Sequence, residues 1–313
     1  MRIGTRRSAL ALAQAELVSR LLGGAEVIPI ATRGDSQPPE AAGGEDKPPD
    51  WAGGEDKSRW VAELESALAD GDIDLAVHSA KDVPGELADG LALLGAPPRA
   101  AVEDVLCGVP SLEDLRPGAR VGTSSIRRVA QLRSARADLE PVMIRGNVDT
   151  RLRKLAEPGE GLQAIVLARA GLQRLGRESE IGARLDPERF VPAPGQGTLA
   201  LEGRAGDARV AQAVRAITDA DALACLLAER ALADALDASC HTPLGAYAVP
   251  AGCGCLHLRA WVGLPDGSSW IGDELLGGFY EPEALGRDLA RRMQSVGAGD
   301  LLRRADAIAA GAA

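Results

Sequence analysis

Residues 1–31 read MRIGTRRSALALAQAELVSRLLGGAEVIPIA, and this stretch decides the fold class. Residues 2–5 are typical of a short strand, and Ser8 can cap the helix that follows. The apolar residues of that helix recur at helical spacing: Leu10, Ala13, Leu17 and Leu21. Gly23-Gly24 ends the helix, and residues 26–31 predict a second strand. A strand, a helix and a strand in this order favour a mostly parallel sheet covered by helices.

Two further units follow along the chain. A helix over 60–69 and a strand over 74–78 complete the first unit, and a second α/β unit begins near Asp104. The second unit has expected strands near 105–109, 120–123, 141–144 and 163–168, and expected helices that start near Ser125 and Asn147. Residues 193–197 then break the chain before a strand over 198–202. From Asp219 a long helix to Leu236 introduces a small α+β unit, with expected strands over 244–249, 256–262 and 269–276 and helices from Glu281.

The bulk composition is that of a globular protein: 46% of the 313 residues are hydrophobic. A formal net charge of −10 argues against a general nucleic-acid binder. We expect neither a signal peptide nor a membrane span, because no basic start leads into an apolar stretch and no apolar run is long enough. Five cysteines, an odd number, favour a reduced cytoplasmic protein, and three histidines make a multi-histidine metal site unexpected.

Arginines recur at three junctions between a strand and a helix: residues 4–8, 122–128 and 145–151. A helix N-terminus binds anions through its unpaired N–H groups, and guanidinium adds forked hydrogen bonds that match a carboxylate. One such junction alone would fit an ordinary helix cap with solvated arginines. The spacing matches neither a phosphate-binding loop nor a dinucleotide fingerprint. The three junctions together favour a small ligand with several carboxylates.

Two more segments are candidates for chemistry. Asp82 lies at a strand end beside Lys81, where it can stabilise a cation or exchange a proton, although a turn Asp before Pro84 is also common. Cys240 lies between a helix and a strand, although a lone Cys is more often a small buried hydrophobe. The adjacent His241 invites a Cys/His hydrolase interpretation, which we disfavour because neighbours in an extended segment point to opposite sides.

With these motifs, the chain resembles the porphobilinogen deaminases (hydroxymethylbilane synthases) along nearly its whole length. The stretches that carry the resemblance are 5–14, 78–84, 121–128, 145–152, 170–176, 194–197 and 240–247. The resemblance implies two α/β domains like type 2 periplasmic binding proteins, with the active cleft between them, and a small α+β C-terminal domain. The implied boundaries are 1–98 with 195–216 for the first domain, 99–194 for the second and 217–313 for the third.

The resemblance also implies a function. It predicts a transferase that deaminates four porphobilinogen molecules and joins them head to tail into hydroxymethylbilane, on a dipyrromethane cofactor linked to Cys240 by a thioether. Asp82 is the implied catalytic residue, which stabilises positive charge through a pyrrole N–H. Besides Cys240, the implied cofactor-binding residues are Ser79, Lys81, Thr123, Ser125, Arg127, Arg128, Arg145 and Gly146. The implied substrate-binding residues are Arg6, Ser8, Gln14, Arg145, Arg151 and Arg174.

The lid of the family departs from its usual sequence here. Family members often carry a Gly-Gly-Lys-Gly-Leu-Phe-like lid, whereas residues 53–60 read GGEDKSRW within a long Pro/Gly/Asp-rich stretch. By resemblance, Lys57 and Trp60 take the lid roles. We expect a cytoplasmic monomer with porphobilinogen as its ligand, no metal, and neither nucleic acid nor membrane as partner. Two alternatives remain: a two-lobed solute-binding module without chemistry, and a Cys-dependent hydrolase or transferase.

Overall fold

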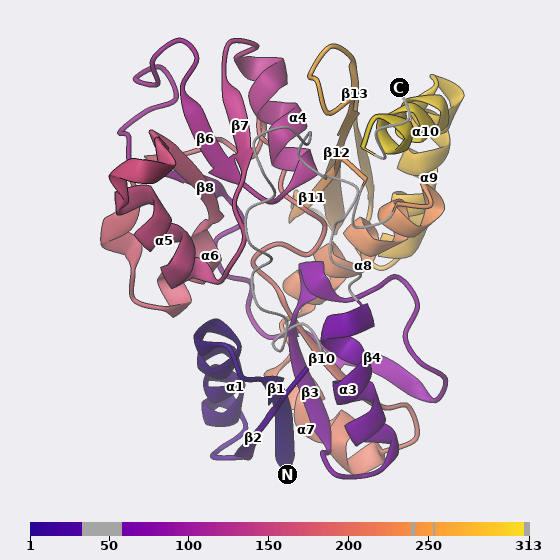
Figure 1. The fold of residues 1–313 in the computed structure, drawn as a ribbon. Helices are drawn as coiled ribbons and strands as arrows, with labels where there is room; N and C mark the ends of the chain where they lie inside the picture. Colours follow the sequence, from indigo (N-terminus) through magenta and orange to yellow (C-terminus); the bar gives the residue numbers. More distant parts are fainter. Residues whose placement is uncertain (33–57, 239–241, 253, 310–313) are drawn as a thin grey trace.

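The computed structural model describes residues 1–32, 58–238, 242–252 and 254–309. These residues form three sheets, and each sheet is covered by its own helices (Figure 1). We call the unit around the first sheet the first lobe, the unit around the second sheet the second lobe, and the rest the C-terminal unit. The chain crosses from the first lobe to the second over residues 96–103 and returns over 185–198.

The first sheet has the strand order β2-β1-β3-β10-β4. Its strands are β1 (Arg2–Arg6), β2 (Glu26–Ile30), β3 (Leu75–Ser79), β4 (Leu91–Gly95) and β10 (Leu199–Arg204). Strand β1 pairs in parallel with β2 and β3, whereas β10 runs antiparallel to both β3 and β4. The expectation of a mostly parallel sheet is therefore confirmed, with β10 as the strand that runs against the other four. This strand starts where the chain returns from the second lobe, which is the edge at which β3 ends, so it must run the opposite way.

The helices of the first lobe are α1 (Ala9–Leu21), α3 (Ser58–Ala69) and α7 (Ala208–Ile217), and η1 (Ala80–Asp82) is a short 3-10 turn after β3. The Ser8 hydroxyl accepts a hydrogen bond from the Ala11 backbone N–H at 3.3 Å, which confirms the predicted cap of α1. Buried Ile3, Val18 and Val77 lie in the core between α1 and the sheet.

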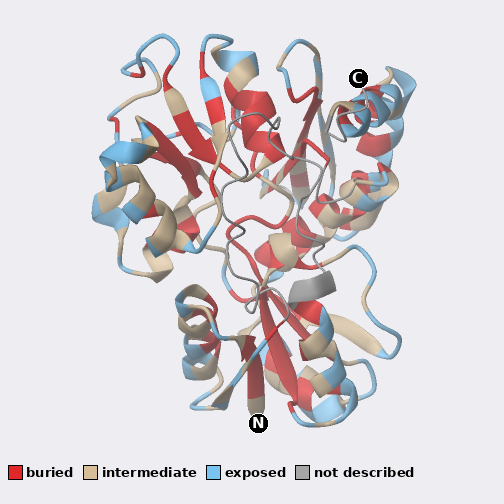
Figure 2. Ribbon diagram, in the orientation of Figure 1, coloured by how far each residue is buried: buried red, intermediate tan, exposed pale blue. Residues whose placement is uncertain are grey.

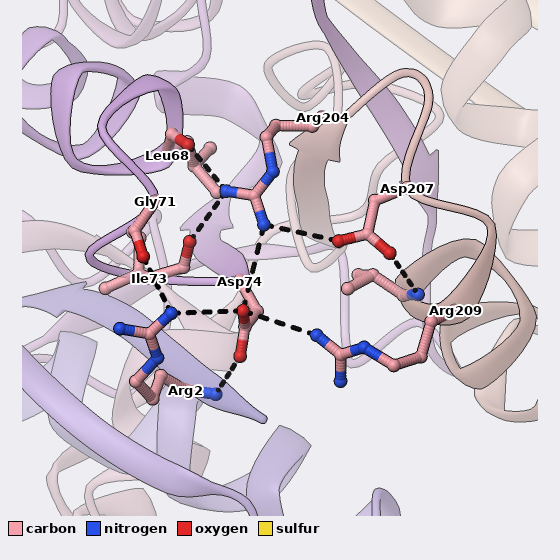
Figure 3. Close-up of polar contacts among 9 residues, drawn as sticks. Arg2, Leu68, Gly71, Ile73, Asp74, Arg204, Asp207 and Arg209 are labelled. Atoms are coloured by element: carbon pink, nitrogen blue, oxygen red, sulfur yellow. Dashed lines mark hydrogen bonds and ion pairs between the residues drawn. The ribbon is translucent and has the colours of Figure 1, made fainter.

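A polar network lies at the end of the first sheet where β1 and β3 begin and β10 ends (Figure 3). The Asp74 carboxylate, just before β3, accepts the backbone N–H of Arg2 at 2.7 Å and forms ion pairs with Arg2 and Arg209 at 3.3 Å and Arg204 at 3.7 Å. Arg204 also pairs with Asp207, the N-cap of α7, at 3.2 Å. The arginines at this end of the sheet therefore form ion pairs that connect β1, β3, β10 and α7.

The second sheet has the order β7-β6-β8-β5-β9. Its strands are β5 (Asp104–Cys107), β6 (Arg120–Thr123), β7 (Glu140–Met143), β8 (Ala164–Ala168) and β9 (Ala183–Arg184). Its helices are α4 (Ile126–Ala135), α5 (Val148–Ala156), α6 (Arg169–Arg174) and the 3-10 turns η2 (Pro158–Glu160) and η3 (Glu178–Glu180). Strand β5 enters from the first lobe and runs antiparallel to β8, just as β10 does to β3. The Asn147 side chain caps α5 by accepting the Thr150 N–H at 2.9 Å.

The C-terminal unit is an antiparallel sheet with helices packed on one face. Its elements are α8 (Ala220–Ala235), β11 (Leu244–Pro250), β12 (Cys255–Gly263), β13 (Trp270–Gly278), α9 (Pro282–Ser295) and α10 (Ala298–Ala309). Leu232 of α8, Leu258 of β12 and Leu289 of α9 are fully buried between the helices and the sheet. The opposite face of β13 exposes Trp270 and Leu276.

These elements confirm the predicted α/β class, with two periplasmic-binding-protein-like lobes and a small α+β C-terminal unit. The central strands of the two lobes are mostly buried, whereas the edge strands β2, β4, β7 and β9 and the outer faces of the helices are more exposed (Figure 2). Four elements that the sequence did not predict complete the lobes: β4, β9, α6 and α7. Across the described ranges, no helix combines the length and the apolar character that a membrane crossing requires.

Candidate functional site

The predicted strand-end residues of the first lobe face the second lobe. Gln14, on the buried face of α1, donates from Nε2 to the Ser79 hydroxyl at the end of β3, at 2.8 Å. Directly after Ser79, the turn η1 presents Lys81 and Asp82, and Gly195 of the returning segment packs against Ala80, with an added Cβ only 3.0 Å from the Ala80 Cβ. The structure therefore brings together the residues predicted after β1 and after β3.

Lys81 is a half-buried cation that interacts electrostatically with charged residues of both lobes. Burial lowers its pKa from 10.5 to about 8; Asp82 and Asp104 raise the pKa, and Arg128 and Arg127 lower it. The two arginines and Asp104 belong to the second lobe, so Lys81 lies at the contact between the lobes. Among the described residues, none forms a hydrogen bond or ion pair with the Asp82 carboxylate, which is half-buried beside Lys81.

Arg127 and Arg128 open α4 in the second lobe, and both are held by the buried carboxylate of Asp104. Arg127 NH2 lies 2.8 Å from Asp104 Oδ2, and Arg128 donates to Asp104 Oδ1 from Nε at 3.0 Å and from NH2 at 2.7 Å. Gln196 Nε2 donates to the same Oδ1 at 2.9 Å. Burial alone would raise the pKa of Asp104, but the two guanidinium groups hold it well below its ordinary value.

We call Lys81, Asp82, Asp104, Arg127 and Arg128 the interlobe cluster. It contains three cations and two carboxylates, so it carries a net positive charge. Among the residues that the structure describes, the buried Nε of Arg127 has no hydrogen-bond partner, although NH1 and NH2 of the same guanidinium are both engaged. Burial and the neighbouring Arg128 lower the pKa of Arg127, whereas Asp104 raises it. The cluster therefore has spare donor capacity for an anion.

Other predicted residues surround this cluster. Arg174 on α6 donates from NH2 to the Gly197 carbonyl at 2.6 Å, and its buried Nε has no partner. Burial lowers the pKa of Arg174 to about 10, and no carboxylate offsets this effect. Arg145 is half-buried and has no hydrogen-bond or ion-pair partner within the described part of the chain. Both arginines are suited to bind carboxylates of a ligand.

The loop before α5 is shaped by a glycine. Gly146 has φ +116°, and a Cβ there would lie 2.7 Å from the Thr150 side chain. The Gly146 carbonyl accepts Arg151 Nε at 2.7 Å, which holds that side chain over the start of the helix. The remaining predicted positions keep their places at strand ends: Thr123 is buried and accepts the Ser125 N–H at 3.2 Å, and Arg6 is half-buried at the end of β1.

Several predicted residues cannot be placed in the site. Lys57 and Cys240 lie outside the described residues. Trp60 belongs to the first turn of α3, and its side chain is not described. Three other thiols are placed, at Cys107, Cys225 and Cys255. Burial raises the pKa of Cys107 to about 11 and that of Cys225 to about 12. Neither of these two thiols is therefore a nucleophile at neutral pH.

Four residues that the sequence did not single out organise the site. Besides Asp104 and Gln196, a buried ion pair joins Arg99 of the first crossover to Glu229 of α8, with NH1 to Oε1 at 2.7 Å and NH2 to Oε2 at 3.1 Å. Glu229 also accepts the backbone N–H of Gly195 at 2.7 Å and of Ala248 at 2.8 Å. One carboxylate thus ties both crossovers to the C-terminal unit. Only Gln196 had a sequence signal, because it lies in the motif at 194–197.

Together the fold and the site define a two-lobed α/β protein with an excess of cations where the lobes meet, suited to a small molecule with several carboxylates. Two family models match the sequence: "Porphobilinogen deaminase, dipyromethane cofactor binding domain" over residues 1–212 and "Porphobilinogen deaminase, C-terminal domain" over residues 223–295. The chain belongs to the porphobilinogen deaminase family. It is a transferase of porphyrin and haem biosynthesis that makes hydroxymethylbilane from porphobilinogen with a dipyrromethane cofactor. The family, enzyme and cofactor predictions are confirmed.

Curated relatives span nearly the whole chain. A porphobilinogen deaminase of Xanthomonas euvesicatoria pv. vesicatoria is 44% identical over 310 residues, covering 96% of this chain and 98% of the relative. One from Rubrobacter xylanophilus is 43% identical over 306 residues, covering 96% of this chain and 95% of the relative.

Solved structures with a related fold are more distant. A periplasmic substrate-binding protein of an ABC transporter from Coxiella burnetii is 14% identical with a TM-score of 0.39, covering 69% of this chain and 91% of that chain. A nutrient binding protein from Burkholderia cenocepacia, bound to methionine, is 12% identical with a TM-score of 0.40, covering 69% of this chain and 90% of that chain. No functional conclusion follows from these two similarities.

Proposed function

We propose that the interlobe cluster is the centre at which four porphobilinogen molecules are deaminated and joined head to tail. The observation that carries this proposal is the position of Lys81, which interacts electrostatically with Asp82 of its own lobe and with Arg127, Arg128 and Asp104 of the other lobe. Among the described residues, the Asp82 carboxylate has no hydrogen-bond or ion-pair partner. Each pyrrole unit brings two carboxylates, and the cluster has more cations than its own carboxylates neutralise. The site therefore fits a chain of pyrroles better than a single small acid.

The dipyrromethane cofactor fits the same residues. We propose that Cys240 holds it through a thioether and that the cations of the site bind its carboxylates: Lys81, Arg127, Arg128 and Arg145, with Ser79, Thr123, Ser125 and the backbone at Gly146 as hydrogen-bonding partners. The buried, unpartnered Nε of Arg127 is the structural feature that supports this fit. When bound, the cofactor supplies the free pyrrole carbon to which the first substrate is joined.

Asp82 is the proposed catalytic residue. Its carboxylate accepts a pyrrole N–H of the substrate and stabilises the positive charge that develops when ammonia leaves, because an anion aimed at developing positive charge lowers the barrier. Arg6, Ser8, Gln14, Arg145, Arg151 and Arg174 are the proposed substrate-binding residues. Arg174 has the strongest structural support, since its Nε is buried and, among the described residues, neither a hydrogen-bond partner nor a carboxylate satisfies it. Lys57 and Trp60 remain proposed lid residues.

The experiment is intact mass spectrometry of the chain purified from cells that make porphobilinogen. We expect an adduct of two pyrrole units and a coloured Ehrlich reaction on the wild type and on a Cys107→Ala control, and no adduct on Cys240→Ala. An unmodified wild-type chain would support the solute-binding alternative. An adduct on another cysteine would remove Cys240 from its role. Alkylation-sensitive ester or amide hydrolysis without a pyrrole adduct would instead support the Cys-dependent hydrolase.

We further propose a cytoplasmic monomer that binds neither nucleic acid nor membranes, with domains 1–98 plus 195–216, 99–194 and 217–313. The division of the three sheets along the chain and the match of a separate C-terminal family domain support these boundaries. The acidic net charge of −10 supports the absence of a nucleic-acid partner. Light scattering of the purified protein should give a molar mass near the 32.4 kDa of one chain; twice that mass would contradict the monomer.

A further inference from the structure

A pocket lies apart from the interlobe cluster, between α4 of the second lobe and the outer face of the C-terminal sheet. Its volume is about 450 Å³, and Gln131, Phe190, Val191, Trp261 and Trp270 are among the residues that line it. Cavities of this size accommodate small organic ligands. None of the residues proposed to bind substrate or cofactor lines this pocket.

The floor of the pocket is aromatic and flat. Trp261 of β12 pairs with Gly272 of β13, and Gly263 pairs with Trp270, so each tryptophan faces a glycine across the two strands. A Cβ added at Gly263 would lie 2.4 Å from the Trp261 ring, and one at Gly272 would lie 3.4 Å from the Trp270 ring. The glycines therefore let both rings lie over the sheet. Trp270 is 57% exposed, which is unusual for so large an apolar side chain.

The two ends of the pocket are fixed by contacts between the second lobe and the C-terminal unit. At one end Arg133 donates to the Pro265 carbonyl at 3.2 Å, beside the turn between β12 and β13. At the other end Arg259 NH1 lies 3.6 Å from Glu188 Oε2, while Arg259 NH2 lies 2.7 Å from Glu274 Oε2. Because contacts hold both ends, the pocket is present before a ligand binds.

A buried acceptor in the wall has no partner. Gln131 is 3% exposed, and its Nε2 donates to the Val191 carbonyl at 2.9 Å, which fixes the orientation of the amide. The Gln131 Oε1 is buried, and no residue in the described part of the chain donates a hydrogen bond to it. A buried acceptor is normally satisfied, so this oxygen lacks a donor that a ligand in the pocket can supply.

We propose that this pocket binds an uncharged, planar aromatic molecule that carries a ring N–H. The ring stacks on the tryptophan floor, since aromatic rings pack favourably on one another, and its N–H donates to Gln131 Oε1. Two arginines and three carboxylates line the pocket: Arg189, Arg259, Glu188, Asp273 and Glu274. Because Arg292 pairs with Asp273 at 2.8 Å, the charges around the pocket balance, which favours a neutral ligand. The Val191 carbonyl also accepts Arg127 NH1 at 2.8 Å, so the pocket shares a hydrogen-bond acceptor with the interlobe cluster.

The test is saturation-transfer NMR and calorimetry on the full-length, cofactor-loaded protein, with indole and 1-methylindole as probes. The two probes share the fused aromatic ring, but 1-methylindole has an N-methyl group in place of the N–H proton and therefore cannot donate. We expect saturable binding of indole that is about tenfold tighter than that of 1-methylindole, which is the order of one hydrogen bond to a buried acceptor. Gln131→Leu should remove this difference. Trp270→Ala should weaken both probes, whereas Leu276→Ala, on the same exposed face of β13 outside the pocket, should change neither.

Three results would overturn the proposal. Indole could fail to saturate up to its solubility limit, the two probes could bind wild type equally, or Trp270→Ala could leave binding unchanged. Because Trp270 is more than half exposed, its replacement by Ala should not unfold the protein, and circular dichroism checks this. The readout is binding and not turnover, so the outcome is independent of the proposed roles at the interlobe cluster.

Discussion

The buried Arg99–Glu229 pair should contribute strongly to stability. Glu229 has no exposed side-chain surface, and the Arg99 side chain is 12% exposed. Glu229→Gln keeps the size of the side chain but leaves the buried Arg99 guanidinium without its counter-ion. It also places an amide NH2 group, which can only donate, against groups that donate to the carboxylate in the wild type. Breaking one partner of a buried pair costs about 3–5 kcal/mol, and we expect that loss in the free energy of unfolding. Arg99→Met should cost a similar amount.

Urea unfolding followed by far-UV circular dichroism and by tryptophan fluorescence measures this loss. Because Glu229 ties both crossovers to the C-terminal unit, the two transitions should coincide in wild type and separate in Glu229→Gln. The double variant Arg99→Met/Glu229→Gln should cost less than the sum of the two single losses by at least about 1 kcal/mol. The exposed pair Arg153–Glu157 is the control, and Glu157→Gln should cost less than about 0.5 kcal/mol. Single losses below about 1 kcal/mol, or strict additivity, would refute this reasoning.

Three further predictions concern the site. Asp82→Asn should keep the circular dichroism spectrum but lower porphobilinogen consumption at least about a hundredfold; rates like wild type would end its catalytic role. In cofactor-free protein, burial lowers the pKa of Lys81 from 10.5 to about 8. Between these two pH values the unfolded chain therefore binds more protons than the folded chain. The free energy of unfolding rises with pH over this range. Lys81→Met should abolish that rise, of about 3 kcal/mol, in urea titrations across this range. Gly146→Ala should lower the melting temperature more than Gly118→Ala does, because only the first places a Cβ against a neighbour, Thr150 at 2.7 Å; equal shifts would contradict the strain.

Local signals in the sequence predicted most of the elements, although they missed β4, β9, α6 and α7. Ser8 and Asn147 were expected to begin helices, and both side chains do accept the capping hydrogen bonds. The direction of β10 was not predictable in this way. A strand's alternation does not encode its direction, and β10 becomes antiparallel only because the intervening lobe returns the chain at the edge where β3 ends.

The counter-ions of the site were also beyond local reasoning. Arg127 and Arg128 stood out by their motif, but Asp104, which holds both, lies at the start of β5 and resembles an ordinary residue at a strand edge. Its role depends on the long-range pairing of β5 with β8, which brings it under α4. Likewise, no local pattern marks Glu229 within an Ala/Leu-rich helix, although it is fully buried and saturated with hydrogen bonds.

The Glu229 contact also has a consequence for how the protein is made. During synthesis from the N-terminus, both lobes have all their described strands once β10 has left the ribosome. The partner of Arg99, Glu229, lies on α8 and is synthesised later. Domains generally fold as they emerge, so both lobes can fold while Arg99 in the first crossover still lacks its counter-ion. The two crossovers are locked only when the C-terminal helix arrives. A nascent chain arrested between α7 and α8 would therefore contain two folded lobes whose mutual orientation is not yet set.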